Sequence, residues 1–160
     1  FDRVYHPLSD RVMHDKSSKS IPQSFWDQLL LLREGVNQAL EPARKDGVIG
    51  SGLDAAVTIY SIHSDLSDPE FHAFCMKMAA ELHYFFIVSS VQWVEVDSPP
   101  EGCYNSVLSG VYISASACEE KKCARCWHRV AHVGRDPKHQ DICLRCVGHL
   151  SDHIEKREWF

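Results

Sequence analysis

The sequence predicts an α+β fold, with two helices packed on a small sheet and a small four-cysteine module after them. Apolar residues recur every three or four positions over 24–47, as on one face of a helix. They alternate over 53–60, as along a half-buried strand. Two Cys-x-x-Cys pairs stand near the end of the chain. We therefore expect three parts: a connecting arm at 1–23, an α+β body at 24–118, and a zinc-binding module with a basic tail at 119–160.

The composition is that of a globular protein, since 44% of the 160 residues are hydrophobic and 24% are charged. The charge is unevenly spread, because residues 1–118 carry a net −7 and residues 119–160 a net +2. The total of −5 gives no general attraction to nucleic acid, so any such contact must come from a local patch.

Seven cysteines are present, and three stand apart from the paired motifs: Cys75, Cys103 and Cys118. This usage favours a reducing compartment over a disulfide framework. No stretch approaches the ~20 apolar residues that cross a bilayer, and no signal peptide is apparent. We predict a cytoplasmic monomer that does not bind a membrane. Because the chain begins at Phe1 rather than methionine, we expect a piece of a longer polypeptide.

A long helix is predicted to follow the arm, which ends near Pro22 and has little sign of regular structure. Ser24 and Asp27 form a capping-box pattern at its start. Gly47 is expected to end the helix, and Pro42 to kink or fray its last turn. Its apolar stripe consists of Phe25, Leu29, Leu32, Val36, Leu40 and Ala43.

A strand over 53–60 and a second helix come next. Asp68 and Pro69 suit the N-cap and the first helical position. The side chains expected to point inward from this helix are Phe71, Phe74, Cys75, Met78 and Leu82. We interpret Cys75 as a small core residue rather than a nucleophile.

Two further strands complete the predicted sheet. Residues 84–96 are rich in aromatic and β-branched side chains and predict a strand after a helical entry, interrupted at 89–90. A turn is predicted at 98–102, and 107–117 is predicted as the last strand.

The two Cys-x-x-Cys pairs are typical of a four-cysteine zinc site. Each short turn can point two thiolates at one ion, and the sixteen residues between the pairs let the second turn complete a tetrahedron with Zn–S distances of ~2.3 Å. Four protein ligands close the site, which favours one structural zinc over hydrolytic chemistry. The alternatives are four unrelated cysteines, two disulfides in a secreted domain, and a Cys3His site that uses His139. The predicted ligands are Cys123, Cys126, Cys143 and Cys146.

Arg125 and Arg145 hold the same position in the two cysteine turns. A zinc ion with four thiolates has a formal charge of −2, so both arginines could compensate it; alternatively they point outward to phosphates. Trp127 is expected to cover the metal site, while Trp159 fits that role or stacking on an unpaired base equally well. The candidate RNA-binding residues are Arg125, Arg129, Arg145, Lys156 and Arg157.

Several motifs agree in order and spacing with one known family. They are Cys-Ala-Arg-Cys-Trp-His at 123–128, Val133-Gly134, Ile142-Cys-Leu-Arg-Cys-Val147, Glu155-Lys-Arg-Glu158 and, upstream, Phe25-Trp-Asp-Gln-Leu-Leu and Leu53-Asp-Ala-Ala-Val. This set resembles the C-terminal region of bacterial isoleucyl-tRNA synthetases over nearly all of residues 21–160. Pro42 departs from a helix that is usually unbroken in that family.

The resemblance implies a class I synthetase that uses ATP to attach isoleucine to its tRNA and that edits mischarged valine. ATP would act only in the intact enzyme, because these residues contain neither the HIGH signature nor a nucleotide-binding fold. The polar run at 16–20 is similar to the KMSKS loop but lacks its methionine and a preceding Rossmann strand, so we interpret it as coincidence. We expect no catalytic residue in this chain. Its implied partners are isoleucine tRNA and the remainder of the synthetase.

Two other functions fit the cysteine motif. A DNA repair glycosylase has a C-terminal zinc finger of similar spacing, but it needs a catalytic N-terminal proline where this chain has Phe1. A protein-interaction zinc ribbon would suit the acidic body.

Overall fold

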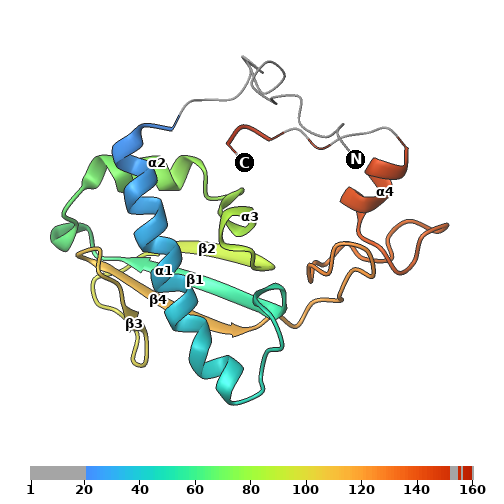
Figure 1. The fold of residues 1–160 in the computed structure, drawn as a ribbon, viewed down its shortest axis with the longest axis horizontal. Coiled ribbons are helices and arrows are strands. Elements are labelled where there is room, and N and C mark those ends of the chain that lie inside the picture. The colour runs from blue at the N-terminus through green and yellow to red at the C-terminus, as the bar shows by residue number, and fades with distance from the viewer. Residues whose placement is uncertain (1–20, 152–154, 156, 160) are drawn as a thin grey trace, which may run out of the picture.

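The computed structural model describes residues 21–151, 155 and 157–159. Within them the fold is α+β, as predicted, and helices and one four-stranded sheet form the body (Figure 1). A four-cysteine cluster follows the body in the sequence. Most of the predicted arm, including the run at 16–20, lies outside the described residues. The elements are α1 (Gln23–Lys45), β1 (Ala55–Ser61), α2 (Pro69–Lys77), α3 (Leu82–Phe86), β2 (Ser90–Glu95), β3 (Tyr104–Asn105), β4 (Val111–Ala117) and α4 (Leu144–Leu150).

The sheet has the strand order β2-β1-β4-β3. β1 pairs in parallel with β2, where Val57 lies opposite Val91, and antiparallel with β4, where Ile59 lies opposite Ile113. A parallel pair needs a crossover connection, and the segment that contains α2 and α3 supplies it. β1 alternates buried and half-buried residues along its whole length, which confirms the predicted period of two.

Helix α1 lies across the sheet and packs mainly against β4 (Figure 1). The predicted stripe is confirmed, since Leu29, Leu32 and Val36 are fully buried. Gly35 permits the close approach, because a Cβ atom there would lie 3.0 Å from Cδ1 of Ile113.

The ends of α1 differ from the prediction. The capping box at Ser24 is wrong, because Gln23 already begins the helix and Pro22 holds the N-cap position without a side-chain hydrogen bond. Pro42 lies inside the helix, which continues to Lys45, so its last turn remains formed. Gly47 follows the helix in the left-handed region, with φ 68°, as a helix stop requires.

The predicted second helix is two helices. Asp68 caps α2 by accepting a hydrogen bond from the backbone N–H of Phe71 at 2.9 Å, as predicted. α2 ends at Lys77, and α3 begins only at Leu82 after a turn. Cys75 is fully buried, and this burial raises the pKa of its thiol, which confirms the core interpretation.

The segment 84–96 is a strand after a helical entry, as predicted: α3 occupies its beginning, Ile87 ends that helix in the left-handed region with φ 57°, and the strand is β2. The other strand prediction is wrong in its limits. The segment 107–117 is strand only over β4, because Gly110 turns the chain with φ 73°. β3 was not predicted, since two residues carry no periodicity.

The body and the cysteine module have separate buried clusters. The larger cluster joins the inner faces of the helices and the sheet. The smaller one consists of Cys123, Val133, Ile142, Cys143 and Cys146. Among the described residues, no helix combines the length and the apolar character needed to span a membrane.

Candidate zinc site and its junction with the body

The four cysteines are positioned by two similar turns. After the first, the backbone N–H of Trp127 donates to the carbonyl of Cys123 at 3.0 Å; after the second, that of Val147 donates to the carbonyl of Cys143 at 3.0 Å. Between the turns, Gly134 has φ 80°, and a Cβ atom there would lie 2.7 Å from the carbonyl oxygen of Gln140. Only glycine fits this loop, which brings the second turn back to the first.

The four sulfur atoms form one compact group. All lie within 4.8 Å of one another, with Sγ–Sγ distances of 3.8 Å for Cys123 and Cys146 and 3.7 Å for Cys126 and Cys143. A tetrahedral zinc with Zn–S bonds of ~2.3 Å separates its sulfurs by about 3.8 Å, so the donor set fits that ion. All seven cysteines are among the described residues, and the structure contains all of them as free thiols. No histidine among the described residues, His139 included, belongs to the group.

The thiols sit in different electrostatic surroundings. Burial acts to raise the pKa of Cys123, but backbone N–H groups, including that of Cys143 at 3.3 Å from its sulfur, hold it at about 6. Burial raises the pKa of Cys143 to about 12. Four adjacent thiolates would repel one another, so the four sulfurs cannot all ionise unless a cation lies among them. A bound zinc ion would supply that positive charge.

Arg125 and Arg145 each contact a cysteine of the other Cys-x-x-Cys turn. Arg125, from the first turn, hydrogen-bonds Cys146 and acts to lower the pKa of that thiol against the effect of burial. Arg145, from the second turn, hydrogen-bonds Cys126, and this contact raises the pKa of its guanidinium although burial acts to lower it. Both arginines therefore stand where they offset the negative charge of the sulfurs. Arg145 is also half-buried, with its guanidinium 5.3 Å from the ring centroid of Tyr84, whereas Arg125 is exposed.

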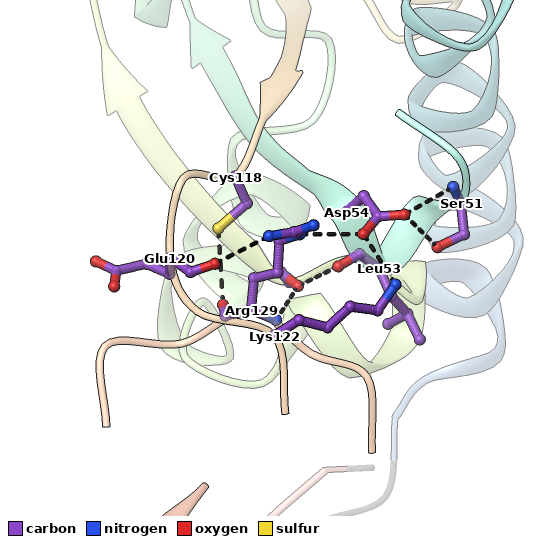
Figure 2. Close-up of polar contacts among 8 residues, drawn as sticks. Ser51, Leu53, Asp54, Cys118, Glu120, Lys122 and Arg129 are labelled. Atoms are coloured by element: carbon purple, nitrogen blue, oxygen red, sulfur yellow. Dashed lines mark hydrogen bonds and ion pairs between the residues drawn. The ribbon is translucent and has the colours of Figure 1, made fainter. Parts of the chain in front are cut away.

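Arg129 lies at the junction between module and body (Figure 2). Its Nε donates to Oδ1 of Asp54 at 3.0 Å, one of its terminal nitrogens donates to the carbonyl of Glu120 at 3.2 Å, and its backbone N–H donates to Oγ of Ser89 at 2.7 Å. Nζ of Lys122 donates to the same Asp54 oxygen at 3.1 Å. The guanidinium of Arg129 is thus engaged inside the protein.

The tail returns to the body at α3. The guanidinium of Arg157 lies 3.8 Å from the ring centroid of Tyr84, and Glu155 accepts hydrogen bonds from Arg157 and from the Tyr84 hydroxyl. Trp159 packs edge-on against Phe74, with ring centroids 5.2 Å apart. Lys156 lies outside the described residues.

Trp127 does not cover the metal site. Its side chain is 62% exposed, and its backbone is in the left-handed region with φ 66°. The sequence analysis also missed Asp54 and Tyr84 as junction residues. Ser51 and Asp54 form a capping box around the short turn before β1, and that Ser-x-x-Asp pattern was a readable signal that the strand begins after Asp54. Nothing in the sequence marks Tyr84.

Comparisons with known proteins agree with this geometry. Residues 120–147 match the family described as a zinc finger found in FPG and IleRS. Over 134 residues the chain is 38% identical to a protein of Pseudoalteromonas translucida (strain TAC 125) named isoleucine–tRNA ligase. The aligned region covers 84% of this chain but only 14% of that relative, so the chain spans a small part of the relative's length.

Proposed function

Because residues 120–147 form a zinc finger of the kind found in FPG and IleRS, and most of the chain is homologous to a segment of an isoleucine–tRNA ligase, we propose that it is the C-terminal, tRNA-binding portion of such an enzyme. The proposal depends mainly on how much of the chain is similar to the isoleucine–tRNA ligase. The similarity extends over 134 residues, whereas the finger occupies only 120–147, so the body takes part in it as well. A DNA repair glycosylase would share the finger alone.

The zinc in this proposal is structural. Cys123, Cys126, Cys143 and Cys146 would hold one ion and leave no position open for water or substrate. The ion would replace the hydrophobic core that the module lacks, since its buried cluster is small and consists largely of the cysteines.

The intact enzyme would use ATP to attach isoleucine to its tRNA and would remove mischarged valine in a separate domain. Both reactions, and the ATP site, would lie in the remainder of the synthetase chain, and this portion would contribute no catalytic residue. It would act in the cytoplasm as part of one monomeric enzyme.

The RNA contacts proposed from the sequence have unequal support. Arg125 hydrogen-bonds the sulfur of Cys146 but is exposed, so we assign a phosphate contact to it first. Arg129 is held by Asp54, and the guanidiniums of Arg145 and Arg157 lie against Tyr84. These three are better placed to hold the module than to reach a phosphate.

The test is filter binding of the zinc-loaded chain to an isoleucine tRNA transcript, with other tRNAs and duplex DNA as competitors. We expect the isoleucine tRNA to compete best. Better competition by duplex DNA would favour the glycosylase function, and no affinity for any competitor would overturn the proposal for this chain. Arg125→Ala should weaken tRNA binding, while Arg135→Ala, at another exposed position of the module, serves as the matched control. If Arg125→Ala lowers zinc affinity and leaves tRNA affinity intact, Arg125 acts only on the metal site.

A further inference from the structure

The sheet of the body has one covered side and one open side. α1 crosses the covered side (Figure 1), and every second residue of β1, starting with Ala55, is buried there. The residues between them, Ala56, Thr58 and Tyr60, are only half-buried, and they point to the other side. Neither Ala56 nor Tyr60 belongs to the buried cluster of the body or packs against it. We call these three residues, with those aligned to them across the sheet, the open face.

A row of side chains crosses the open face. Tyr60 lies opposite Val94 of β2 and Tyr112 of β4, and Tyr112 lies opposite Asn105 of β3. Residues that are opposite in paired strands project to the same side of a sheet, with Cβ atoms ~4.5–5.5 Å apart. The row therefore spans all four strands, with two half-buried tyrosines at its centre and an exposed residue at each end.

The rest of the open face is polar and uncharged. Thr58 lies opposite Gln92 and Ser114. Ala56 lies opposite Ser90 and Ser116. None of the residues in these rows carries a charge, although charged residues make up 24% of the chain. The buried centres of protein interfaces are depleted in charged residues and enriched in tyrosine, so this composition favours a protein surface as the occupant.

The surrounding charge disfavours RNA at the open face. Nucleic-acid binding depends on cations that neutralise phosphates, and no row of this face contains one. Glu95 and Asp97 are exposed at and just beyond the end of β2, and residues 1–118 have a net charge of −7. A base stacked on Tyr60 or Tyr112 would bring its phosphates toward these carboxylates. A neutral protein surface meets no such repulsion.

A hollow of about 370 Å³ lies at the same end of the sheet as the two tyrosines. Ile62, which follows β1, lines it together with Glu95 and Asp97. His72, 3.7 Å from Glu95, does not neutralise this carboxylate near pH 7, because burial lowers the pKa of the His72 ring. The hollow thus suits a lysine or arginine side chain. A surface that matches this end of the body is neutral at its centre and has a cation at its rim.

The remainder of the synthetase is the partner that the observations favour. The aligned region is only 14% of the length of the relative, so under the proposed function most of the enzyme lies outside this chain. A partner on the same polypeptide has a high effective concentration, and interfaces between domains of one chain are more polar than obligate interfaces. The zinc module is already docked elsewhere, at Asp54 and Ser89, where β1 and β2 begin.

We propose that the open face is the surface on which the remainder of the synthetase docks, with a neutral surface over Tyr60 and Tyr112 and a basic side chain at the Glu95 and Asp97 carboxylates. The inference rests on the proposed function, since that function supplies the partner. It assigns the two sides of the sheet different tasks: one side holds the core of the body, and the other joins the body to the enzyme.

The first test compares the zinc-loaded chain alone with the intact synthetase, without tRNA. Hydroxyl-radical oxidation, read by mass spectrometry, reports the exposure of Tyr60 and Tyr112; Met76, 42% exposed on α2, is the reference. Both tyrosines should be oxidised severalfold more slowly in the intact enzyme, and Met76 at an unchanged rate. Equal tyrosine rates in the two proteins, or equal protection of Met76, would overturn the proposal.

Two further results would assign the open face to another occupant and also overturn the proposal. Protection that appears in the intact enzyme only after tRNA is added would mean that RNA covers the face. Protection in the isolated chain that increases with its concentration would mean that a second copy covers it.

The second test places a charge on the open face. Thr58→Lys should leave the circular dichroism and the urea midpoint of the isolated chain unchanged, because the position is open to water there. In the intact enzyme the lysine would be buried without a partner, so the protection of Tyr60 and Tyr112 should be lost. Gln38→Lys, at an exposed position of α1, is the matched control and should keep the protection. Ser114→Lys repeats the test at a neighbouring position if Thr58→Lys lowers the midpoint. Protection that survives these changes would contradict the proposal.

The two proposals fail separately. If the chain binds isoleucine tRNA and the tyrosines stay reactive in the intact enzyme, the docking face is wrong and the proposed function stands. If the chain binds no tRNA and the tyrosines are protected in the intact protein, the tRNA-binding role is wrong and the docking face stands.

Discussion

Asp54 binds Arg129 through a single carboxylate oxygen, which also accepts a hydrogen bond from Lys122 (Figure 2). Asp54 belongs to the body, whereas the two cations belong to the module. The side chain of Asp54 is only 14% exposed, and Ser51 bonds its other oxygen at 3.1 Å. One body carboxylate thus holds the segments on both sides of the first cysteine turn, through Lys122 before it and Arg129 after it.

Replacing Asp54 with asparagine should destabilise the junction. Arg129 and Lys122 would keep their charges and lose their shared partner, so we expect the free energy of unfolding to fall by about 1–3 kcal/mol. Urea unfolding followed by circular dichroism measures the change. The matched control is Glu41→Gln, which breaks an ion pair with Arg44 within one helix turn and should cost no more than about 0.5 kcal/mol. Equal effects of the two substitutions would mean that the junction contact adds nothing.

The same carboxylate predicts a pH dependence. Burial acts to raise the pKa of Asp54, but hydrogen bonds from Lys122, Arg129 and Ser51 outweigh it and hold the pKa at about 2, below its ordinary value of 3.8. Because the folded-state pKa is lowered, ionised Asp54 stabilises the fold above about pH 4, and this contribution is lost as the pH falls toward about 2.

Unfolding free energies of the unaltered chain and of Asp54→Asn should therefore differ by a constant amount near neutral pH and converge in acid. A difference that grows as the pH falls would contradict the lowered pKa.

Removal of zinc should unfold the module and spare the body. We expect chelation, or Cys143→Ser, to disorder residues 119–150, because the metal supplies roughly 10–16 kcal/mol to such modules and the body has its own core. Amide hydrogen exchange should show α1 and β1 still protected after chelation. A single transition that abolishes protection everywhere would mean that the two parts fold as one unit. Cys75→Ala, in the body core, is the control that should leave zinc affinity unchanged.

tRNA affinity should depend only weakly on salt. Among the described cations of the module, Lys122, Arg129 and Arg157 are bonded to carboxylates, which reduces the number that can meet phosphates. The plot of log affinity against log salt should have a slope of only a few units, because each neutralised phosphate contributes about one. Filter binding across a salt series measures it, and a slope near −10 would require a much larger basic surface than the structure has.

The elements with a strong local pattern could be predicted from the sequence. The stripe of α1, the alternation of β1, the cap at Asp68 and the cysteine spacing each depend on residues close in the chain. The residues at which the elements begin and end could not be predicted from the sequence, because tertiary contacts determine them. The chain turns between Lys77 and Leu82 to bring α3 toward the module, and no helix-breaking residue marks that turn.

The candidate site likewise has parts that the sequence predicts and parts that only the fold reveals. The four sulfurs follow from spacing, but the role of Arg129 depends on Asp54, which is far away in the sequence. A basic residue beside a metal motif suggests a phosphate contact until its acidic partner is known. The contacts of Tyr84 with Arg145 and Arg157 were equally invisible, since they join three segments that only the fold brings together.

The crossed arrangement of Arg125 and Arg145 has a consequence for any attempt to move this module into another protein. Each arginine neutralises a sulfur of the opposite turn, so neither Cys-x-x-Cys hairpin is electrostatically complete by itself. If one turn were transferred alone, its arginine would lose the thiolate that it contacts, and its own thiolate would lose the arginine of the other turn. The two turns must therefore be transferred together, and changes to one should be designed together with changes to the other.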